Sequence, residues 1–115
     1  MGESPFGERK YIVGWLTCRP GKREALLAIF APYARACLAE EGCRFFEVGP
    51  SVHDEDVVVV CECFASREAH ELHLRSEAFL AFRTKLPDYC VNGRFENVFS
   101  GQVERDTATF DDDPR

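Results

Sequence analysis

The sequence lacks an apolar run of the roughly 20 residues that a membrane span needs, although 45% of its 115 residues are hydrophobic. Its first residues, MGESPFGERK, lack the apolar core of a secretory signal peptide. Lysine and arginine are scattered rather than clustered, and the net charge is −6. These absences argue against a membrane protein, a secreted protein and a nucleic-acid-binding protein, so we expect a single cytoplasmic domain.

The six cysteines lack the spacing of a metal or redox motif, because no two of them form a CxxC pair. In a reducing compartment, free thiols in the core are favoured over disulfides. Cys61 and Cys63 share one face of a predicted strand, but no further ligands converge with them. We therefore predict no metal site and no cofactor.

Alternating and amphipathic segments predict the order strand, helix, strand, strand, helix, strand. This order is typical of an α+β fold, the ferredoxin-like split βαβ arrangement, with an antiparallel sheet and two helices on one face. Gly14 lies inside the first strand and indicates a close approach by another group on that face. We predict a flexible N-terminal arm at residues 1–9, the domain at 10–101, and a C-terminal arm with an acidic tail at 102–115, in which Gln102 to Phe110 form either an arm or an edge strand.

The predicted strands carry apolar residues on both faces, and two helices can cover only one of them. A second copy that packs sheet on sheet would cover the other face, because a two-fold interface is self-complementary. The sequence therefore predicts a homodimer, a dimeric α+β barrel.

The stretch from Asp56 to Phe82 holds the candidate catalytic residues. Glu62 is a lone carboxylate inside a buried strand, where an ionised group needs a partner or a role. Ser66 is a predicted N-cap, and the helix that follows turns His73 toward the sheet, together with Ala69 and Leu72. A second cap at Ser76 restarts the helix. Aromatic residues predicted to form the walls of a substrate pocket are Trp15, Phe46, Phe64, Phe79 and Phe82.

Each of these residues also has a purely structural interpretation. His73 is equally compatible with a buried histidine hydrogen-bonded to backbone, and the aromatic residues with an ordinary core. Glu62 is compatible with a salt bridge to one of three arginines, Arg19, Arg44 or Arg94. A metal-binding face of His70, His73 and Glu77 is disfavoured, because the restart at Ser76 breaks the helical alignment and His70 is expected to face solvent.

Three segments carry a family likeness: YIVGWLTCRPGKREALL, AEEGCRFFEV and CECFASREAHELHLRSEAFLAF. They resemble the antibiotic biosynthesis monooxygenase (ABM) domain family, over nearly the whole chain from Tyr11 to Ser100. The resemblance implies the dimeric α+β barrel already predicted from the strand pattern. Glu62 and His73 match the family's recurring glutamate and histidine, whereas Phe64 stands where many members have tryptophan.

The resemblance implies several chemistries. Our leading hypothesis is an oxidoreductase of the quinol monooxygenase type, which oxidises a small quinol or aromatic phenol with dioxygen and needs no flavin, haem or metal. His73 would take the phenolic proton, and Glu62 would orient the imidazole or bind a substrate hydroxyl. Phe64 weakens a haem-degrading alternative. An isomerase of a small phosphorylated metabolite would need an inward cation from Arg75, Arg83 or Arg94, and a non-catalytic ligand-binding dimer is the third hypothesis.

Overall fold

The computed structural model describes residues 8–110, so most of the predicted N-terminal arm and acidic tail lies outside it. The elements follow the predicted order with one addition at the end, and none of the helices in this part of the chain has the length and apolarity that crossing a bilayer requires. They are β1 (Lys10–Cys18), α1 (Arg23–Leu38), β2 (Cys43–Pro50), β3 (Val57–Phe64), α2 (Arg67–Leu74), α3 (Glu77–Tyr89), β4 (Cys90–Phe99) and β5 (Gln102–Thr109).

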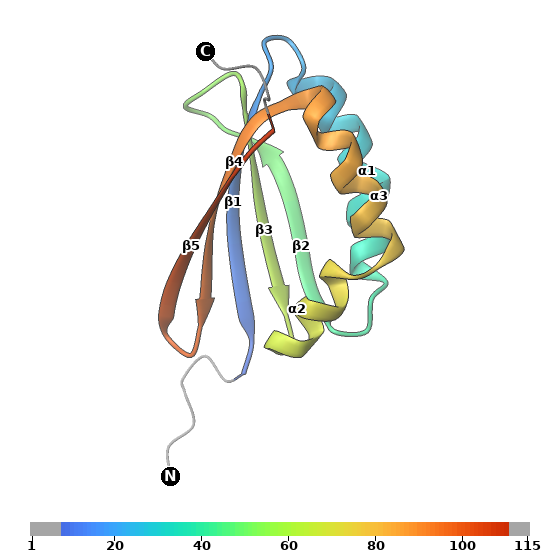
Figure 1. The fold of residues 1–115 in the computed structure, drawn as a ribbon, viewed down its shortest axis with the longest axis vertical. Helices are drawn as coiled ribbons and strands as arrows, with labels where there is room; N and C mark the ends of the chain where they lie inside the picture. Colours follow the sequence, from blue (N-terminus) through green and yellow to red (C-terminus); the bar gives the residue numbers. More distant parts are fainter. Residues whose placement is uncertain (1–7, 111–115) are drawn as a thin grey trace.

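All five strands form one antiparallel sheet in the order β2-β3-β1-β4-β5, and the helices lie along one face of it (Figure 1). This arrangement confirms the predicted ferredoxin-like α+β fold. Residues 102–109, expected as an arm or an edge strand, pair with β4 from Phe99 opposite Gln102 to Asn92 opposite Thr109. The sheet therefore extends one strand beyond the predicted four.

The core lies between the helices and the sheet because strand residues alternate between the two faces. In β1 the even-numbered positions from Ile12 to Cys18 are buried, and β3 follows the same alternation over most of its length. The largest buried apolar side chains on these strands and on α1 are Ile12, Leu16, Leu26, Phe30, Val58, Val60 and Phe64.

The predicted second helix is divided in two, as the second cap indicated. The Ser66 hydroxyl accepts a hydrogen bond from the backbone N–H of Ala69 at 3.0 Å, and Ser76 does the same for Phe79 at 3.1 Å. Leu72 was expected to face the sheet but is 64% exposed. His70 and His73, one helical turn apart, take the inward positions instead, so the expectation of a solvent-facing His70 was wrong.

Gly14 makes room for an aromatic side chain on the helix side of the sheet. It is the cross-strand partner of Phe95, and a Cβ atom at Gly14 would lie 2.6 Å from the Phe95 ring. A side chain at this position would push the ring away from the sheet. The close approach predicted from the sequence is therefore made by Phe95.

The opposite face of the sheet is left without a helix in residues 8–110 (Figure 1). Its central positions on β1 and β3 are half-buried rather than exposed. They include Val13, Trp15, Val57 and Val59, and the Arg94 guanidinium lies 4.5 Å from the centre of the Trp15 ring. We call this surface the open face.

Candidate active site

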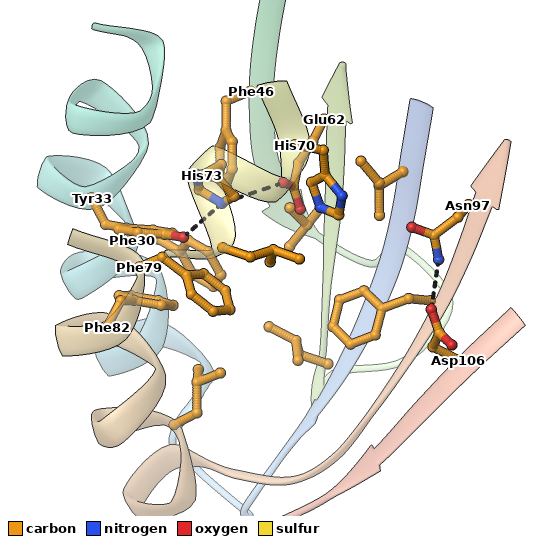
Figure 2. A pocket seen from close by; sticks show the side chains of 16 residues that line it. Phe30, Tyr33, Phe46, Glu62, His70, His73, Phe79, Phe82, Asn97 and Asp106 are labelled. Carbon is orange, nitrogen blue, oxygen red and sulfur yellow. Dashed lines mark hydrogen bonds and ion pairs between the residues drawn. The ribbon is translucent and has the colours of Figure 1, made fainter. Parts of the chain in front are cut away.

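A cavity of about 230 Å³ lies between the helices and the covered face of the sheet (Figure 2). Aromatic and aliphatic side chains make up most of its wall, which is typical of a small-molecule site. The polar residues that line it are Tyr33, Glu62, His70, His73, Asn97 and Asp106.

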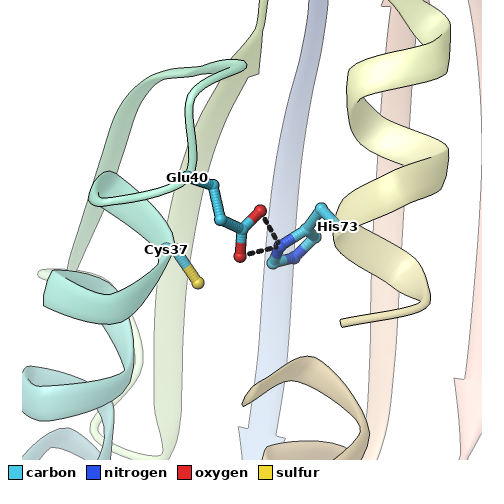
Figure 3. A group of neighbouring side chains, drawn as sticks. All are labelled: Cys37, Glu40 and His73. Carbon is cyan, nitrogen blue, oxygen red and sulfur yellow. Dashed lines mark hydrogen bonds and ion pairs between the residues drawn. The ribbon is translucent and has the colours of Figure 1, made fainter. Parts of the chain in front are cut away.

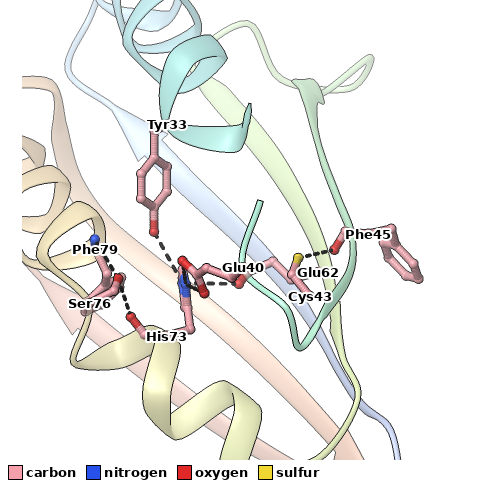
Figure 4. A network of polar contacts seen from close by, with 8 residues as sticks. All are labelled: Tyr33, Glu40, Cys43, Phe45, Glu62, His73, Ser76 and Phe79. Atoms are coloured by element: carbon pink, nitrogen blue, oxygen red, sulfur yellow. Dashed lines mark hydrogen bonds and ion pairs between the residues drawn. The ribbon is translucent and has the colours of Figure 1, made fainter. Parts of the chain in front are cut away.

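His73 is 98% buried and is held from both sides (Figure 4). Its Nδ1 atom lies 3.0 Å and 3.1 Å from the two carboxylate oxygens of Glu40. Because an ionised carboxylate can only accept a hydrogen bond, Nδ1 carries the hydrogen. The lone pair of the neutral ring is then on Nε2, which suits it to act as a base.

The Nε2 atom of His73 faces two other groups of the cavity wall. The Tyr33 hydroxyl lies 3.3 Å away and donates to it, and Glu62 Oε1 lies 3.9 Å away. Tyr33 is itself fixed, because its ring stacks on Phe82 with centroids 4.0 Å apart and an interplanar angle of 5°. The imidazole therefore has a defined orientation before any ligand enters.

Glu62 lies on β3 beneath the imidazole, with 11% of its side chain exposed. Burial, and secondarily the charge of Glu40, raises the pKa of Glu62 to about 8. At neutral pH the carboxyl group is mostly protonated and can donate a hydrogen bond. Glu40 contacts Nδ1 of His73, whereas Glu62 lies 3.9 Å from Nε2, so the predicted role of Glu62 in orienting the imidazole stays a prediction.

Three of the five predicted aromatic residues, Phe46, Phe79 and Phe82, line the cavity. Phe64 is fully buried behind it, with its ring 4.9 Å from that of His73. Trp15 lies on the open face, because it occupies an odd-numbered position of β1, and does not reach the cavity.

Sequence reasoning missed the site roles of Glu40, Tyr33 and the Asn97–Asp106 pair. Tyr33 lies on the buried stripe of α1, as its helical spacing indicates, but that spacing gave no sign of its hydrogen bond to His73. Glu40 follows the end of α1 in a run of three residues, Glu40 to Gly42, that looks like a solvated turn. Nothing in that run distinguishes the glutamate that reaches His73 from its neighbour.

One group of side chains could hold a metal ion in the described chain. The ligand atoms of Cys37, Glu40 and His73 all lie within 4.8 Å of one another (Figure 3). A thiolate, a carboxylate and an imidazole would suit zinc. Such an ion would displace the Glu40–His73 hydrogen bonds, and burial raises the pKa of the Cys37 thiol to about 12, which disfavours the thiolate in its absence.

Residues 11–85 match the sequence profile of the family described as Antibiotic biosynthesis monooxygenase. The chain belongs to this family. The match includes Tyr33, Glu40, Glu62, His70 and His73, and it ends before β4. No curated protein sequence is significantly similar to the chain.

Solved structures share the fold of this family member. The PA3566 protein of Pseudomonas aeruginosa has a TM-score of 0.75 at 22% identity, covering 85% of this chain and 97% of its own. A Caulobacter crescentus CB15 protein, provisionally named an antibiotic biosynthesis monooxygenase, has a TM-score of 0.75 at 22% identity, covering 80% and 89%. A provisionally named Nitrosomonas europaea monooxygenase has a TM-score of 0.69 at 16% identity, covering 90% of each chain. At these identities the likeness concerns the fold.

Proposed function

We propose that this chain is a cofactor-independent monooxygenase that oxidises a small quinol or aromatic phenol with dioxygen. The observation that carries the proposal is His73, whose Nε2 lone pair faces an aromatic cavity while Glu40 holds Nδ1. Membership of the ABM family and the provisional names of two structural neighbours support a monooxygenase in general. The proposal of a small aromatic substrate is supported by the aromatic and aliphatic lining of the cavity.

The reaction begins when a substrate hydroxyl takes the place of the Tyr33 hydroxyl at His73 Nε2 and transfers its proton to that atom. The imidazolium that forms is stabilised by the Glu40 carboxylate, 3.0 Å from Nδ1. The phenolate is electron-rich enough to pass an electron to dioxygen, and the mostly apolar lining of the cavity favours this step. One oxygen atom enters the product, the other leaves as water with two substrate hydrogens, and the organic substrate is the only reductant.

The cavity supports this substrate class better than a phosphorylated one. Its lining contains two acidic residues, Glu62 and Asp106, and among the described residues no lysine or arginine. None of the three cations considered for a phosphate group, Arg75, Arg83 and Arg94, lines the cavity, and the Arg94 guanidinium lies over Trp15 on the open face. A phosphate in the cavity would lack a cationic partner.

The proposed enzyme is a homodimer that buries the open face of the sheet against a second copy. Val13, Trp15, Val57 and Val59 remain partly exposed in one copy, and they lie in the middle of the sheet rather than at its edge. Because these side chains are already half-buried, each would contribute only part of the about 1.5 to 3 kcal/mol that fully burying an apolar side chain provides. A two-fold axis through this face would make the interface self-complementary.

Oxygen uptake tests the proposed activity. The purified protein, without added flavin or metal, is given hydroquinones and anthrone-type phenols while dissolved oxygen is recorded, and ¹⁸O₂ is used to count the oxygen atoms in the product. We expect incorporation of one atom, and a loss of rate of about 10²-fold or more in His73→Ala. His53→Ala, which changes an exposed histidine in the turn before β3, is the matched control.

Folded protein that consumes no oxygen across this panel, or His73→Ala at the wild-type rate, would refute the monooxygenase. Ligand binding that depends on His73 without turnover would instead identify the non-catalytic ligand-binding dimer.

A further inference from the structure

The cavity has a second polar group in its wall, away from His73. Asn97 on β4 donates a hydrogen bond from Nδ2 to Asp106 Oδ2 on β5 at 2.9 Å, and both residues line the cavity (Figure 2). Asn97 is 8% exposed, whereas Asp106 is exposed on the edge strand. Both follow residue 85, where the family match ends, so this pair is not part of the matched family pattern.

The strand register gives the backbone spacing between Asn97 and Glu62, the carboxyl group beside His73. Glu62 on β3 and Asn97 on β4 are both cross-strand partners of Ile12 on β1, so the three residues form one row on the covered face. With neighbouring strands about 4.8 Å apart, the Glu62 and Asn97 backbones are roughly 10 Å from each other. Ile12, Leu16 and the Phe95 ring form an apolar floor between the two polar ends.

The Asn97–Asp106 pair can make further hydrogen bonds. Within residues 8–110, the side chains of Asn97 and Asp106 make no hydrogen bond other than the one between them. Asp106 Oδ1 is therefore free to accept a hydrogen bond from a ligand. His70, 8% exposed, also lines the cavity, and its Nδ1 has no partner in the described chain. In Figure 2 its ring lies between His73 and Asn97. Buried polar atoms of native proteins are normally paired, so the unpaired Nδ1 is consistent with a ligand that completes the site.

The size of the cavity limits the ligand. At about 230 Å³ it is smaller than the roughly 300 to 1,000 Å³ of sites for drug-sized molecules, which favours one or two rings. A ring with hydroxyl groups at opposite positions, extended by a hydrogen bond of about 2.8 Å at each end, has a length comparable to the roughly 10 Å between the Glu62 and Asn97 backbones. The negative charge of Asp106 favours a donor and disfavours an anion at its end.

We propose that the substrate is a para-quinol that binds at both ends, with one hydroxyl at His73 Nε2 and the other donating to the Asn97–Asp106 pair. This inference rests on the proposed function for its substrate class, and it names Asp106 as a specificity-determining residue. Asp106 is exposed and acts only through hydrogen bonding, so Asp106→Asn should fold normally.

Anaerobic binding separates this proposal from the question of turnover. Calorimetry without oxygen compares three ligands of matched shape: 1,4-dihydroxynaphthalene, 4-methoxy-1-naphthol, which lacks the second donor, and 1-naphthol, which lacks the second oxygen. We expect the wild type to bind the diol about tenfold more tightly than the methoxy compound, as for a hydrogen bond to a charged acceptor. In Asp106→Asn that preference should fall to threefold or less, with the affinity for 1-naphthol unchanged.

The matched control is Asp88→Asn, which changes an exposed aspartate of α3 outside the cavity lining and should keep the tenfold preference. Equal affinities for the diol and the methoxy compound in the wild type, an unchanged preference in Asp106→Asn, or no binding of the three ligands at millimolar concentration would each overturn the proposal. A diol preference that depends on Asp106, in a protein that consumes no oxygen, would leave it standing and refute only the monooxygenase.

Discussion

The two faces of the sheet differ in what their side chains can do. The covered face carries the cavity, with a fixed imidazole, a protonated carboxyl group and the Asn97–Asp106 pair. The open face carries valines and Trp15 at its centre, with Arg94 packed on the tryptophan ring. Because strand residues alternate, neighbouring positions of one strand can serve the proposed chemistry and the proposed association separately.

Apolar character alone therefore does not locate a substrate pocket in such a fold. Both faces are apolar, but only the covered face combines apolar walls with buried polar groups that converge on one space. Substitutions on the two faces should therefore have separable effects, one on association and one on activity.

The largest expected effect is on association. Val59→Asp puts a charge at the centre of the open face, twice in a two-fold dimer, where desolvation costs several kcal/mol. We expect the dimer dissociation constant to rise at least about 100-fold, measured by sedimentation equilibrium. Val52→Asp, at a position that is 91% exposed in the β2–β3 turn, is the control and should leave association unchanged. A wild type that is already monomeric and well folded at micromolar concentration would contradict the dimer.

On the covered face, the next effect is a pH dependence of stability caused by Glu62. Its folded pKa of about 8 is higher than the unfolded value of about 4.3. The unfolded state therefore releases the proton first, and the free energy of unfolding falls as pH rises through this interval. One group with this difference in pKa lowers the free energy of unfolding by about 2 kcal/mol between pH 6.5 and 8.5.

Urea unfolding across that pH range checks this, with Glu62→Gln as the variant that cannot titrate. The difference between wild type and variant isolates Glu62 from the buried cysteines, whose raised pKa values add their own loss of stability at high pH. Glu47→Gln, an exposed glutamate of β2, should keep the wild-type slope. Parallel curves for wild type and Glu62→Gln would mean that Glu62 is ionised in the folded protein.

A smaller effect is expected from Glu40→Gln, which keeps the size of the side chain but removes the charge opposite His73 Nδ1. The imidazolium loses its stabilising carboxylate, so kcat/KM should fall about 10- to 100-fold. Glu47→Gln again serves as the control. Equal kcat/KM values for wild type and Glu40→Gln would assign Glu40 a structural role only.

Much of the fold could be predicted because it depends on local patterns. Strand alternation, the caps at Ser66 and Ser76 and the inward direction of His73 follow from spacing and side-chain chemistry. The proposed roles of His73 and Glu62 as a pair stay predictions, although the structure brings their side chains within 3.9 Å.

The remaining site residues depend on contacts between distant segments. Glu40 meets His73 across 33 residues, and Asp106 comes to the cavity only because β5 pairs with β4. Neither contact can be predicted from a regular spacing of residues in the sequence. Leu72 and His70 were misplaced for a local reason: a short helix of eight residues gives too few turns to fix its inward face from spacing.

The smallest expected effect is at Trp15, which the sequence suggested as a pocket wall and which lies on the open face. Trp15→Phe keeps an aromatic ring for the interface and for Arg94, and its side chain does not reach the cavity, so kcat/KM should change by less than about twofold. Phe82→Leu, which removes the ring stacked on Tyr33, should lower kcat/KM more, because the Tyr33 hydroxyl would lose its fixed position beside His73. A tenfold loss in Trp15→Phe with an intact dimer would show that the open face contributes to catalysis, and the two faces would no longer be separable.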